Sequence, residues 1–459
     1  MLDRISRILK SGADPRGVFF MSFTKAAAQE VLGRLGLPRS DNFSTIHSLC
    51  YRITRVHHGA VVDHKKLKEL SAITGVAITG ARYDDEEGLS DGDMYLQIIN
   101  RAENLMIPVD EAYERSDRPG EFEEFMMFAS TYSEWKGAYG FVDFNDMLKR
   151  MLGPGIKFSA SHLLVDEGQD LSPLQWKVID RLIQCSDPKS VHVAGDDDQC
   201  LYSFAGADPH GMFDFEDRHG AKREVLSQSW RIPKSVHTLA HDVIGSVSKR
   251  VDKKYDPRDE VGEVSYSVDV GSLDIEHGEN VMFLGRTHSA LKDVEQLLKD
   301  RALPYRKASG VCLFTNRYAL AIRGVLKAGR GEVITDAEYN ALLKVVIDPS
   351  IRGEVECGNY SALRGHRWKD VLNIPFSILS YYEDVDIEAE PTIVLSTIHG
   401  SKGKESDRVV LLTEQTARVA ESMNTVNGAD DEHRCMYVGI TRAKHKLDII
   451  TSDEGYRLP

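Results

Sequence analysis

Two acidic residues follow a short apolar run in the sequence. The run is Leu163 to Val165, and Asp166 and Glu167 come directly after it. Unbroken apolar runs are typical of buried strands in parallel sheets, and ligands collect at the carboxyl ends of such strands. One carboxylate there could hold Mg²⁺ through waters, while the other orients or deprotonates an attacking water. A solvated acidic turn is the alternative for these two residues taken alone.

Strand-like and helix-like segments alternate around this acidic pair, which is typical of α/β proteins. Residues 18–23 read as a buried strand, and Ser172 with Pro173 marks the start of a helix. Two stretches are instead mostly helical and polar. We therefore predict two α/β cores of parallel strands, each interrupted by a helical insertion: core one at 1–55 and 140–222 with insertion 56–139, and core two at 223–315 and 391–459 with insertion 316–390.

The composition limits the class of protein. With 459 residues the chain is long enough for two to four domains, and its 42% hydrophobic residues are ordinary for a globular protein. The six cysteines are scattered without a CxxC pair, which indicates a reducing compartment and neither a disulfide framework nor a zinc site. No apolar run approaches the roughly 18 residues of a membrane span. We expect a cytoplasmic protein of a bacterial or phage-infected cell.

The net charge of −14 provides no general basic field that would attract nucleic acid. A local basic cleft is sufficient for binding, however, so the motifs have to decide.

Seven motifs occur in a fixed order along the chain, and together they resemble those of superfamily 1 helicases of the UvrD/Rep type. The resemblance runs from near residue 1 to about Leu447 and implies two RecA-like cores of the P-loop NTPase class. Agreement among many separate features makes the resemblance specific. The motifs are FTKAAAQE (23–30), TIHSLC (45–50), LLVDEGQD (163–170), AGDDDQCLYSFAGA (194–207), LSQSWR (226–231), TIHGSKGKESD (397–407) and YVGITRAK (437–444).

The resemblance implies a site that binds ATP and Mg²⁺ and hydrolyses ATP. Asp166 would hold the metal, Glu167 would activate water, and Gln199 would sense the γ-phosphate. Arg231 and Arg442 lie where the family places charge-neutralising arginines, which can contribute about 10³–10⁵ in rate. A surface ion pair worth under about 1 kcal/mol is the alternative for either arginine alone.

Other residues would contact the nucleotide from the second core. Trp230 occupies the position of a Tyr that stacks on adenine in the family, and its larger indole face suits the same role. Gly403 and Glu405 lie in the motif that contacts the nucleotide. A core tryptophan is the alternative for Trp230.

A single-stranded DNA track across both cores is also implied. Aromatic side chains stack on bases for roughly 1–3 kcal/mol per base, whatever the sequence. Hydroxyl, imidazole and ammonium groups suit phosphate contacts. Core packing is the alternative for the two phenylalanines, and a polar loop is the alternative for the two histidines. The residues of the track are Phe23, Thr24, Thr45, His47, Tyr202, Phe204, His399 and Lys402.

The phosphate loop of the family, G-x-x-x-x-G-K-[ST], does not occur in the sequence. A helix at 2–9 precedes the strand at 18–23, so we expect the sequence to begin inside the helix that follows the loop. Three accounts are open: a separate polypeptide supplies the missing strand and loop, the reading frame was assigned too short, or the chain is an ATP-independent descendant. We favour the first two jointly, because the residues that only hydrolysis requires are present.

The motifs therefore predict a DNA helicase or translocase for repair or replication, driven by ATP hydrolysis, with 3′-to-5′ polarity implied by the resemblance alone. The alternative is an ATPase-defective DNA-binding or regulatory descendant. A P-loop enzyme without a nucleic-acid role is disfavoured by the motifs. A phosphate-loop segment in the upstream or neighbouring coding DNA would separate the first two functions.

Overall fold

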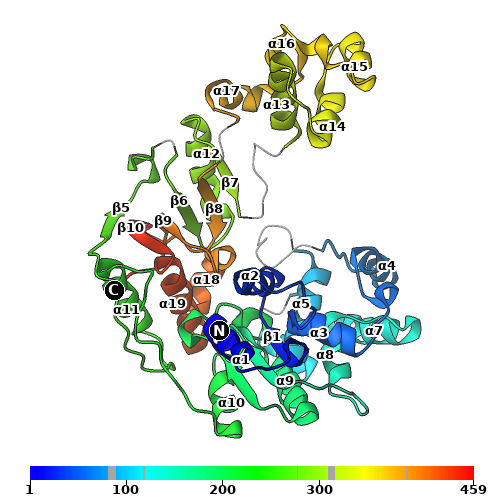
Figure 1. Ribbon diagram of the computed structural model, residues 1–459, viewed down its shortest axis with the longest axis vertical. Coiled ribbons are helices and arrows are strands. Elements are labelled where there is room, and N and C mark those ends of the chain that lie inside the picture. The colour runs from blue at the N-terminus through cyan, green and yellow to red at the C-terminus, as the bar shows by residue number, and fades with distance from the viewer. Residues whose placement is uncertain (81–88, 117–118, 277, 309–315, 389–390) are drawn as a thin grey trace. The chain divides into compact units, whose positions relative to one another are not determined.

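The computed structural model describes residues 1–80, 89–116, 119–276, 278–308, 316–388 and 391–459. The chain divides into two compact units, coloured by residue number in Figure 1. Unit 1 comprises Met1–Val225 and Ser248–Lys253, and unit 2 comprises Leu226–Val247 and Lys254–Pro459. The predicted limits of the second core at residue 315 and of the second insertion at residue 390 lie outside the described residues.

Unit 1 contains a parallel sheet in the order β2-β1-β3-β4. Its strands are β1 (Val18–Met21), β2 (Phe43–Ser44), β3 (His162–Val165) and β4 (Ser190–Val193). β1 is buried along its length, as is β3 beyond its first residue, whereas β4 is half-buried throughout. Met21 pairs with Val165, and Val165 pairs with Val193, so the three strands end side by side. The residues that follow them therefore meet at one edge.

Successive side chains of a strand point to opposite faces of the sheet. Both faces of this sheet carry apolar side chains, and helices cover both. Phe20 and Leu164 pack with Ile5 on one face, whereas Met21 and Val165 belong to a different apolar cluster. The helices of this core are α1 (Leu2–Lys10), α2 (Lys25–Leu35), α3 (Ile46–Ile53), α8 (Phe144–Met151), α9 (Pro173–Ser186) and α10 (Gly211–His219).

Residues between α3 and α8 form a helical group with an apolar core of its own. The group consists of α4 (His64–Thr74), α5 (Asp91–Leu105), α6 (Val109–Glu114) and α7 (Phe122–Tyr139). Tyr95 and Phe128 are buried in its core, with ring centroids 5.4 Å apart.

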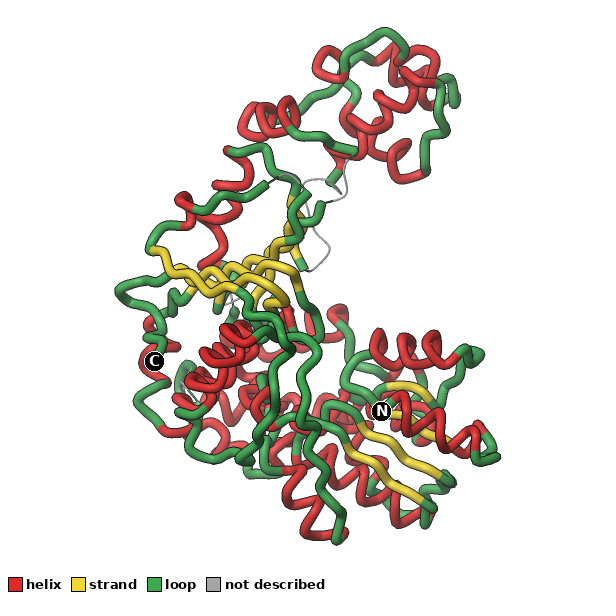
Figure 2. The backbone as a smooth tube through the Cα atoms, turned by 60° about the vertical axis from the view of Figure 1, so that its left-hand side comes forward, coloured by secondary structure: helices red, strands yellow, loops and turns green. Residues whose placement is uncertain are grey.

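Unit 2 contains a second parallel sheet, in the order β5-β10-β9-β6-β8-β7. Figure 2 shows the strands of both sheets in yellow. The strands are β5 (Glu263–Ser267), β6 (Val281–Gly285), β7 (Tyr305–Lys307), β8 (Ile393–Thr397), β9 (Ser406–Leu412) and β10 (Ala443–Ile450). β6 and β8 are buried along their whole length, as expected for central strands of a parallel sheet. The helices of this core are α11 (Lys234–Ile244), α12 (Lys292–Asp300), α18 (Ala417–Ser422) and α19 (Val426–Ile440).

A second helical group lies between β7 and β8 in the sequence. Ile322 and Leu342 are among its buried residues. Its helices are α13 (Arg317–Arg330), α14 (Asp336–Val345), α15 (Pro349–Glu356), α16 (Trp368–Val371) and α17 (Phe376–Asp384).

The prediction of an α/β fold with two parallel sheets is confirmed. Within the described part of the chain, no helix combines the length and the apolar character that crossing a bilayer requires.

Candidate nucleotide and DNA site

Glu167 lies at the carboxyl edge of the unit 1 sheet in a left-handed backbone conformation, with φ of +57°. Such a conformation costs a non-glycine residue about 1–3 kcal/mol, and it is concentrated at functional sites. Two hydrogen bonds hold the turn: Asp166 N–H donates to Met21 O at 2.8 Å, and Gly168 N–H donates to Ala194 O at 2.9 Å. The acidic pair is therefore fixed between β1 and β4.

The carboxyl group of Asp166 lies in an environment that favours a cation. Burial, and then the charge of Glu167, raise the pKa of Asp166 above its ordinary value. The charge of the Met1 amino group acts in the opposite direction. A partly buried carboxylate beside a second acidic residue fits a hard divalent cation.

Gln199 is linked to Glu167 by a short series of hydrogen bonds. The Gln199 amide Nε2 donates to Asp196 Oδ2 at 2.6 Å, and Asp196 N–H donates to Gln169 Oε1 at 3.0 Å. Gln169 Nε2 donates to Glu167 Oε2 at 2.6 Å. A Cβ at Gly195 would lie 2.5 Å from Met212 Sδ and 2.6 Å from Gln169 Oε1, so a larger residue there would displace these side chains. The structure thus connects two of the predicted hydrolysis residues.

Aromatic residues of the predicted DNA track lie in the same unit. The rings of Phe23 and Tyr202 are stacked, with centroids 4.8 Å apart and planes at 19°. Phe204 meets Tyr202 edge-on at 6.0 Å. Phe23 is 36% exposed, so core packing is the wrong alternative for this residue.

A cleft of about 490 Å³ opens beside Phe23. Thr45 and His47 line it, as predicted DNA contacts, and burial lowers the pKa of His47, so that its imidazole is neutral at neutral pH. The cleft also has four lining residues that the sequence did not single out: Asn100, Asn104, Phe144 and Asn145.

Of these four residues, Phe144 is the one that the sequence could most readily have pointed to. Its exposed fraction is 61%, and its ring meets His47 edge-on at 5.8 Å. The sequence shows a phenylalanine directly after Asp143, the N-cap of α8. Only the packing of α8 against α3 reveals that it faces the cleft.

Thr24 and Thr45 also have a structural role. The Thr24 hydroxyl accepts from Ala27 N–H, and the Thr45 hydroxyl accepts from Ser48 N–H, each at 3.2 Å. They are N-caps of α2 and α3, and a cap of this kind contributes about 1 kcal/mol. Helix N-termini attract anions, so capping is compatible with a nearby phosphate.

In unit 2, a predicted nucleotide group also comes together. Arg231 Nε donates to Glu405 Oε2 at 2.9 Å, and Lys444 Nζ lies 2.8 Å from Glu405 Oε1. These cations, Lys444 foremost, lower the pKa of Glu405. Trp230 is 85% exposed, so a core role is wrong for it, and Gly403 forms a turn with φ of +75°.

Arg442 is almost completely buried within unit 2, with 1% of its surface exposed. Its Nε donates to Val438 O at 2.9 Å, and its Nη2 donates to Thr441 Oγ1 at 3.2 Å. The alternative of a surface ion pair is therefore wrong for Arg442. A role at a phosphate requires this side chain to turn outward.

The two remaining predicted DNA contacts lie after β8. His399 is buried in a 3₁₀ turn at His399–Ser401, and Lys402 follows it half-buried. Both residues have interactions within the protein.

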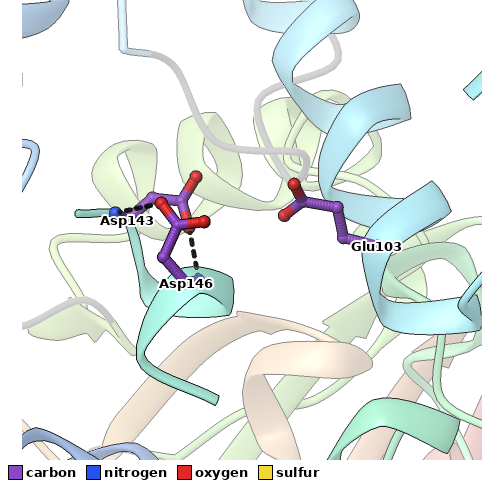
Figure 3. A group of neighbouring side chains, drawn as sticks. All are labelled: Glu103, Asp143 and Asp146. Atoms are coloured by element: carbon purple, nitrogen blue, oxygen red, sulfur yellow. Dashed lines mark hydrogen bonds between the residues drawn. The ribbon is translucent and has the colours of Figure 1, made fainter. Parts of the chain in front are cut away.

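Three carboxylates cluster outside the predicted sites. Oxygens of Glu103, Asp143 and Asp146 lie within 4.8 Å of one another (Figure 3). Lys136 pairs with Asp143 and, at 2.8 Å, with Asp146, and Lys149 pairs with Glu103. Because two ammonium groups already pair with these three carboxylates, we describe the cluster as an ion-pair network that joins α5, α7 and α8.

Comparison with known proteins identifies the family. The model of the UvrD/REP helicase N-terminal domain matches residues 1–220, and that of the UvrD-like helicase C-terminal domain matches residues 356–454. Together these stretches make up more than half of the chain. The chain belongs to the UvrD/Rep helicase family.

Three relatives within the UvrD/Rep family illustrate the similarity. The putative ATP-dependent DNA helicase YjcD of Bacillus subtilis is 26% identical over 71% of this chain and 47% of its own length. The ATP-dependent DNA helicase PcrA of Leuconostoc citreum is 24% identical over 83% of this chain and 53% of its own. DNA helicase II of Haemophilus influenzae is 23% identical over 73% of this chain and 50% of its own length. The chain thus spans about half the length of the curated relatives it matches.

Proposed function

We propose that this chain is the motor part of an ATP-dependent DNA helicase or translocase that moves along single-stranded DNA. The observation that carries the proposal is the hydrogen-bonded series from Glu167 through Gln169 and Asp196 to Gln199, in the same unit as the aromatic cleft. The 3′-to-5′ polarity is proposed from family membership alone.

Each residue of the acidic edge has a separate role in this proposal. Asp166 holds Mg²⁺ through its carboxylate, and the metal neutralises charge on the phosphates when bound. Glu167 accepts a proton from the attacking water, or orients it, with Gln169 fixing the position of its carboxylate. Gln199 contacts the γ-phosphate through its amide. Trp230, Gly403 and Glu405 bind the nucleotide, and Arg231 and Arg442 stabilise the charge of the transferred phosphoryl group.

The DNA role rests on chemistry that does not depend on base sequence. Exposed Phe23 and stacked Tyr202 offer ring faces to bases, and Phe204 and Phe144 extend the aromatic set. The remaining proposed contacts, with phosphates, are Thr24, Thr45, His47, His399 and Lys402.

We further propose that a phosphate loop from outside these 459 residues completes the nucleotide site. The sequence holds no G-x-x-x-x-G-K-[ST] string. Among the described strands, β4 pairs only with β3 and is half-buried along its length, which leaves an edge to which a parallel strand can add. A strand and loop from an upstream segment or a separate polypeptide would fit there. The division into two cores and two helical insertions is part of the same proposal.

DNA-stimulated ATPase activity tests the function. The 459-residue chain is measured alone and with a phosphate-loop segment added in cis or in trans. We expect little turnover alone and clear turnover with the segment, abolished by Glu167→Gln, which keeps the size of the side chain but removes its charge.

Two outcomes contradict parts of this proposal. Robust turnover by the chain alone, lost in Glu167→Gln, refutes the need for a supplied loop. Failure of the segment to restore turnover in well-folded protein that still binds DNA favours the alternative function, an ATPase-defective DNA-binding or regulatory protein.

A further inference from the structure

A short segment, Ser248–Lys253, contacts the loop that carries Gln199. It belongs to unit 1, whereas the residues on both sides of it in the sequence belong to unit 2. We call it the return segment. Arg250 and Lys253 project from it onto three consecutive acids, Asp196 to Asp198.

The contacts between the return segment and these acids are specific. Arg250 Nε and Nη2 donate to the two carboxylate oxygens of Asp198 at 2.9 and 2.7 Å. Lys253 pairs with Asp196, Asp197 and Asp198, and Val251 N–H donates to Asp197 Oδ2 at 2.8 Å. The Asp198 side chain is 1% exposed and that of Arg250 15%. Bidentate, desolvated pairs of this kind fix geometry, and loss of one partner leaves an uncompensated charge.

Asp196 transmits this arrangement to Gln199. One of its oxygens contacts Lys253, and the other accepts from the Gln199 amide at 2.6 Å. Burial would raise the pKa of Asp196, but Lys253 more than offsets this and lowers it. An ionised carboxylate can only accept hydrogen bonds, so Gln199 must turn its NH₂ group toward Asp196. The carbonyl oxygen of the Gln199 amide is thereby directed away from Asp196.

The same link reaches the residue proposed to activate water. Asp196 N–H donates to Gln169, whose amide in turn donates to Glu167. Two residues, Asp196 and Gln169, therefore connect Lys253 to Glu167.

We propose that Lys253 and Arg250 are positioning residues, which set the orientation of the Gln199 amide and, through Gln169, of Glu167 for ATP hydrolysis. Neither is proposed to touch the nucleotide. The inference rests on the proposed function, so it needs one measurement that depends on turnover and one that does not.

The first measurement is steady-state ATPase kinetics with DNA and the phosphate-loop segment present. A misplacement of catalytic groups by about 1 Å can cost about 10²-fold in rate, so we expect Lys253→Met to lower kcat by about 10- to 100-fold with little change in KM. Lys253→Arg should recover most of kcat. Exposed Lys254, changed to Met, is the matched control and should behave as the unchanged protein.

A double-variant comparison separates positioning from general structural damage. In a Gln199→Ala background, Lys253→Met should lower kcat by a smaller factor than in the unchanged protein, because the part of its effect that passes through Gln199 is already lost and only the part through Gln169 remains. Fully additive losses, or an unchanged kcat in Lys253→Met alone, overturn the proposal.

The second measurement is amide hydrogen exchange of the chain without nucleotide. Lys253→Met and Arg250→Met should speed exchange in a peptide covering 196–199, whereas Lys254→Met should not. If the unchanged protein never hydrolyses ATP, the proposed function fails, and this arm decides the inference about positioning. Unaltered exchange at 196–199 in both variants overturns it.

Discussion

Trp230 and Arg231 are neighbours in the sequence, and only the arginine has a charged partner. The Trp230 ring is exposed, whereas the Arg231 guanidinium is engaged by Glu405. An exposed indole directly before a held arginine suits a stacking partner beside a charge contact. A ligand phosphate has to compete with Glu405 for Arg231. Lys444 also pairs with Glu405, so this carboxylate keeps a cationic partner if Arg231 turns to a phosphate.

Changing Trp230 tests the proposed adenine contact. Base–aromatic stacking contributes about 1–3 kcal/mol, so Trp230→Ala should weaken binding of a non-hydrolysable ATP analogue by about 5- to 150-fold. Trp230→Tyr should retain most of the affinity, because a phenol ring also offers a flat face. Titration calorimetry with the phosphate-loop segment present measures both variants. Equal affinity for the Ala variant and the unchanged protein would exclude Trp230 from the nucleotide site.

Helix α8 joins two functions at the scale of elements. Its first residue, Phe144, lines the aromatic cleft, whereas Asp143 and Asp146 of the same turn belong to the ion-pair network with Lys136. Asp143 also accepts from the Tyr132 hydroxyl at 2.9 Å. The network therefore ties the start of α8, and with it Phe144, to α7.

Removal of Phe144 should weaken DNA binding. Phe144→Ala is expected to raise the Kd for a single-stranded oligonucleotide by about 5- to 150-fold, the equivalent of about 1–3 kcal/mol for one stacked base. Phe376→Ala is the control, because Phe376 is an even more exposed phenylalanine on α17. Fluorescence anisotropy measures both. Equal losses in the two variants would show a nonspecific effect of removing an exposed ring.

Lys136→Met should destabilise the fold more than any change of Lys149. Lys136 and Asp143 are about one-tenth exposed, and breaking a buried pair costs about 3–5 kcal/mol. Lys149 is 43% exposed, so Lys149→Met should cost less than about 1 kcal/mol. Urea unfolding at pH 7 compares the two. Similar losses of unfolding free energy in the two variants would mean that the pair of Lys136 and Asp143 is not the main stabilising contact of the network.

The stability lost in Lys136→Met should depend on pH. Burial would raise the pKa of Asp143, but Lys136 lowers it below the ordinary value of 3.8. The folded carboxyl therefore binds its proton less readily than the unfolded one, so its stabilisation is present above that value and is lost as the pH falls through the folded pKa. In Lys136→Met the buried carboxyl loses its partner, so the deficit relative to the unchanged protein should shrink on acidification. A deficit that grows toward low pH would contradict the assignment.

The whole molecule consists of two units, each with a sheet and apolar clusters of its own. Phe20 in β1 and Phe283 in β6 are both fully buried, each within its own unit. Separate cores are typical of chains that unfold in more than one step.

Scanning calorimetry should resolve two unfolding transitions. Phe→Ala changes in a core cost about 3–5 kcal/mol, so Phe20→Ala should lower one transition and Phe283→Ala the other. A single transition lowered by both variants would mean that the two units unfold as one.

The sequence by itself determined the features that depend on neighbouring residues. Apolar runs such as Leu163 to Val165 identified buried strands, and Ser172 with Pro173 marked the start of α9, because strand burial and helix capping are set within a few positions. The α/β class, the family and the acidic pair after β3 followed from this local information.

Only the tertiary structure decided which distant residues touch. Lys253 contacts Asp196 across 57 positions of sequence, and Arg442 turns into the interior instead of forming a surface ion pair. Phe144 became part of the cleft through the packing of α8 on α3. Such contacts depend on how sheets and helices are stacked, and burial then fixes the partner of each charge, because a desolvated charge has to be paired.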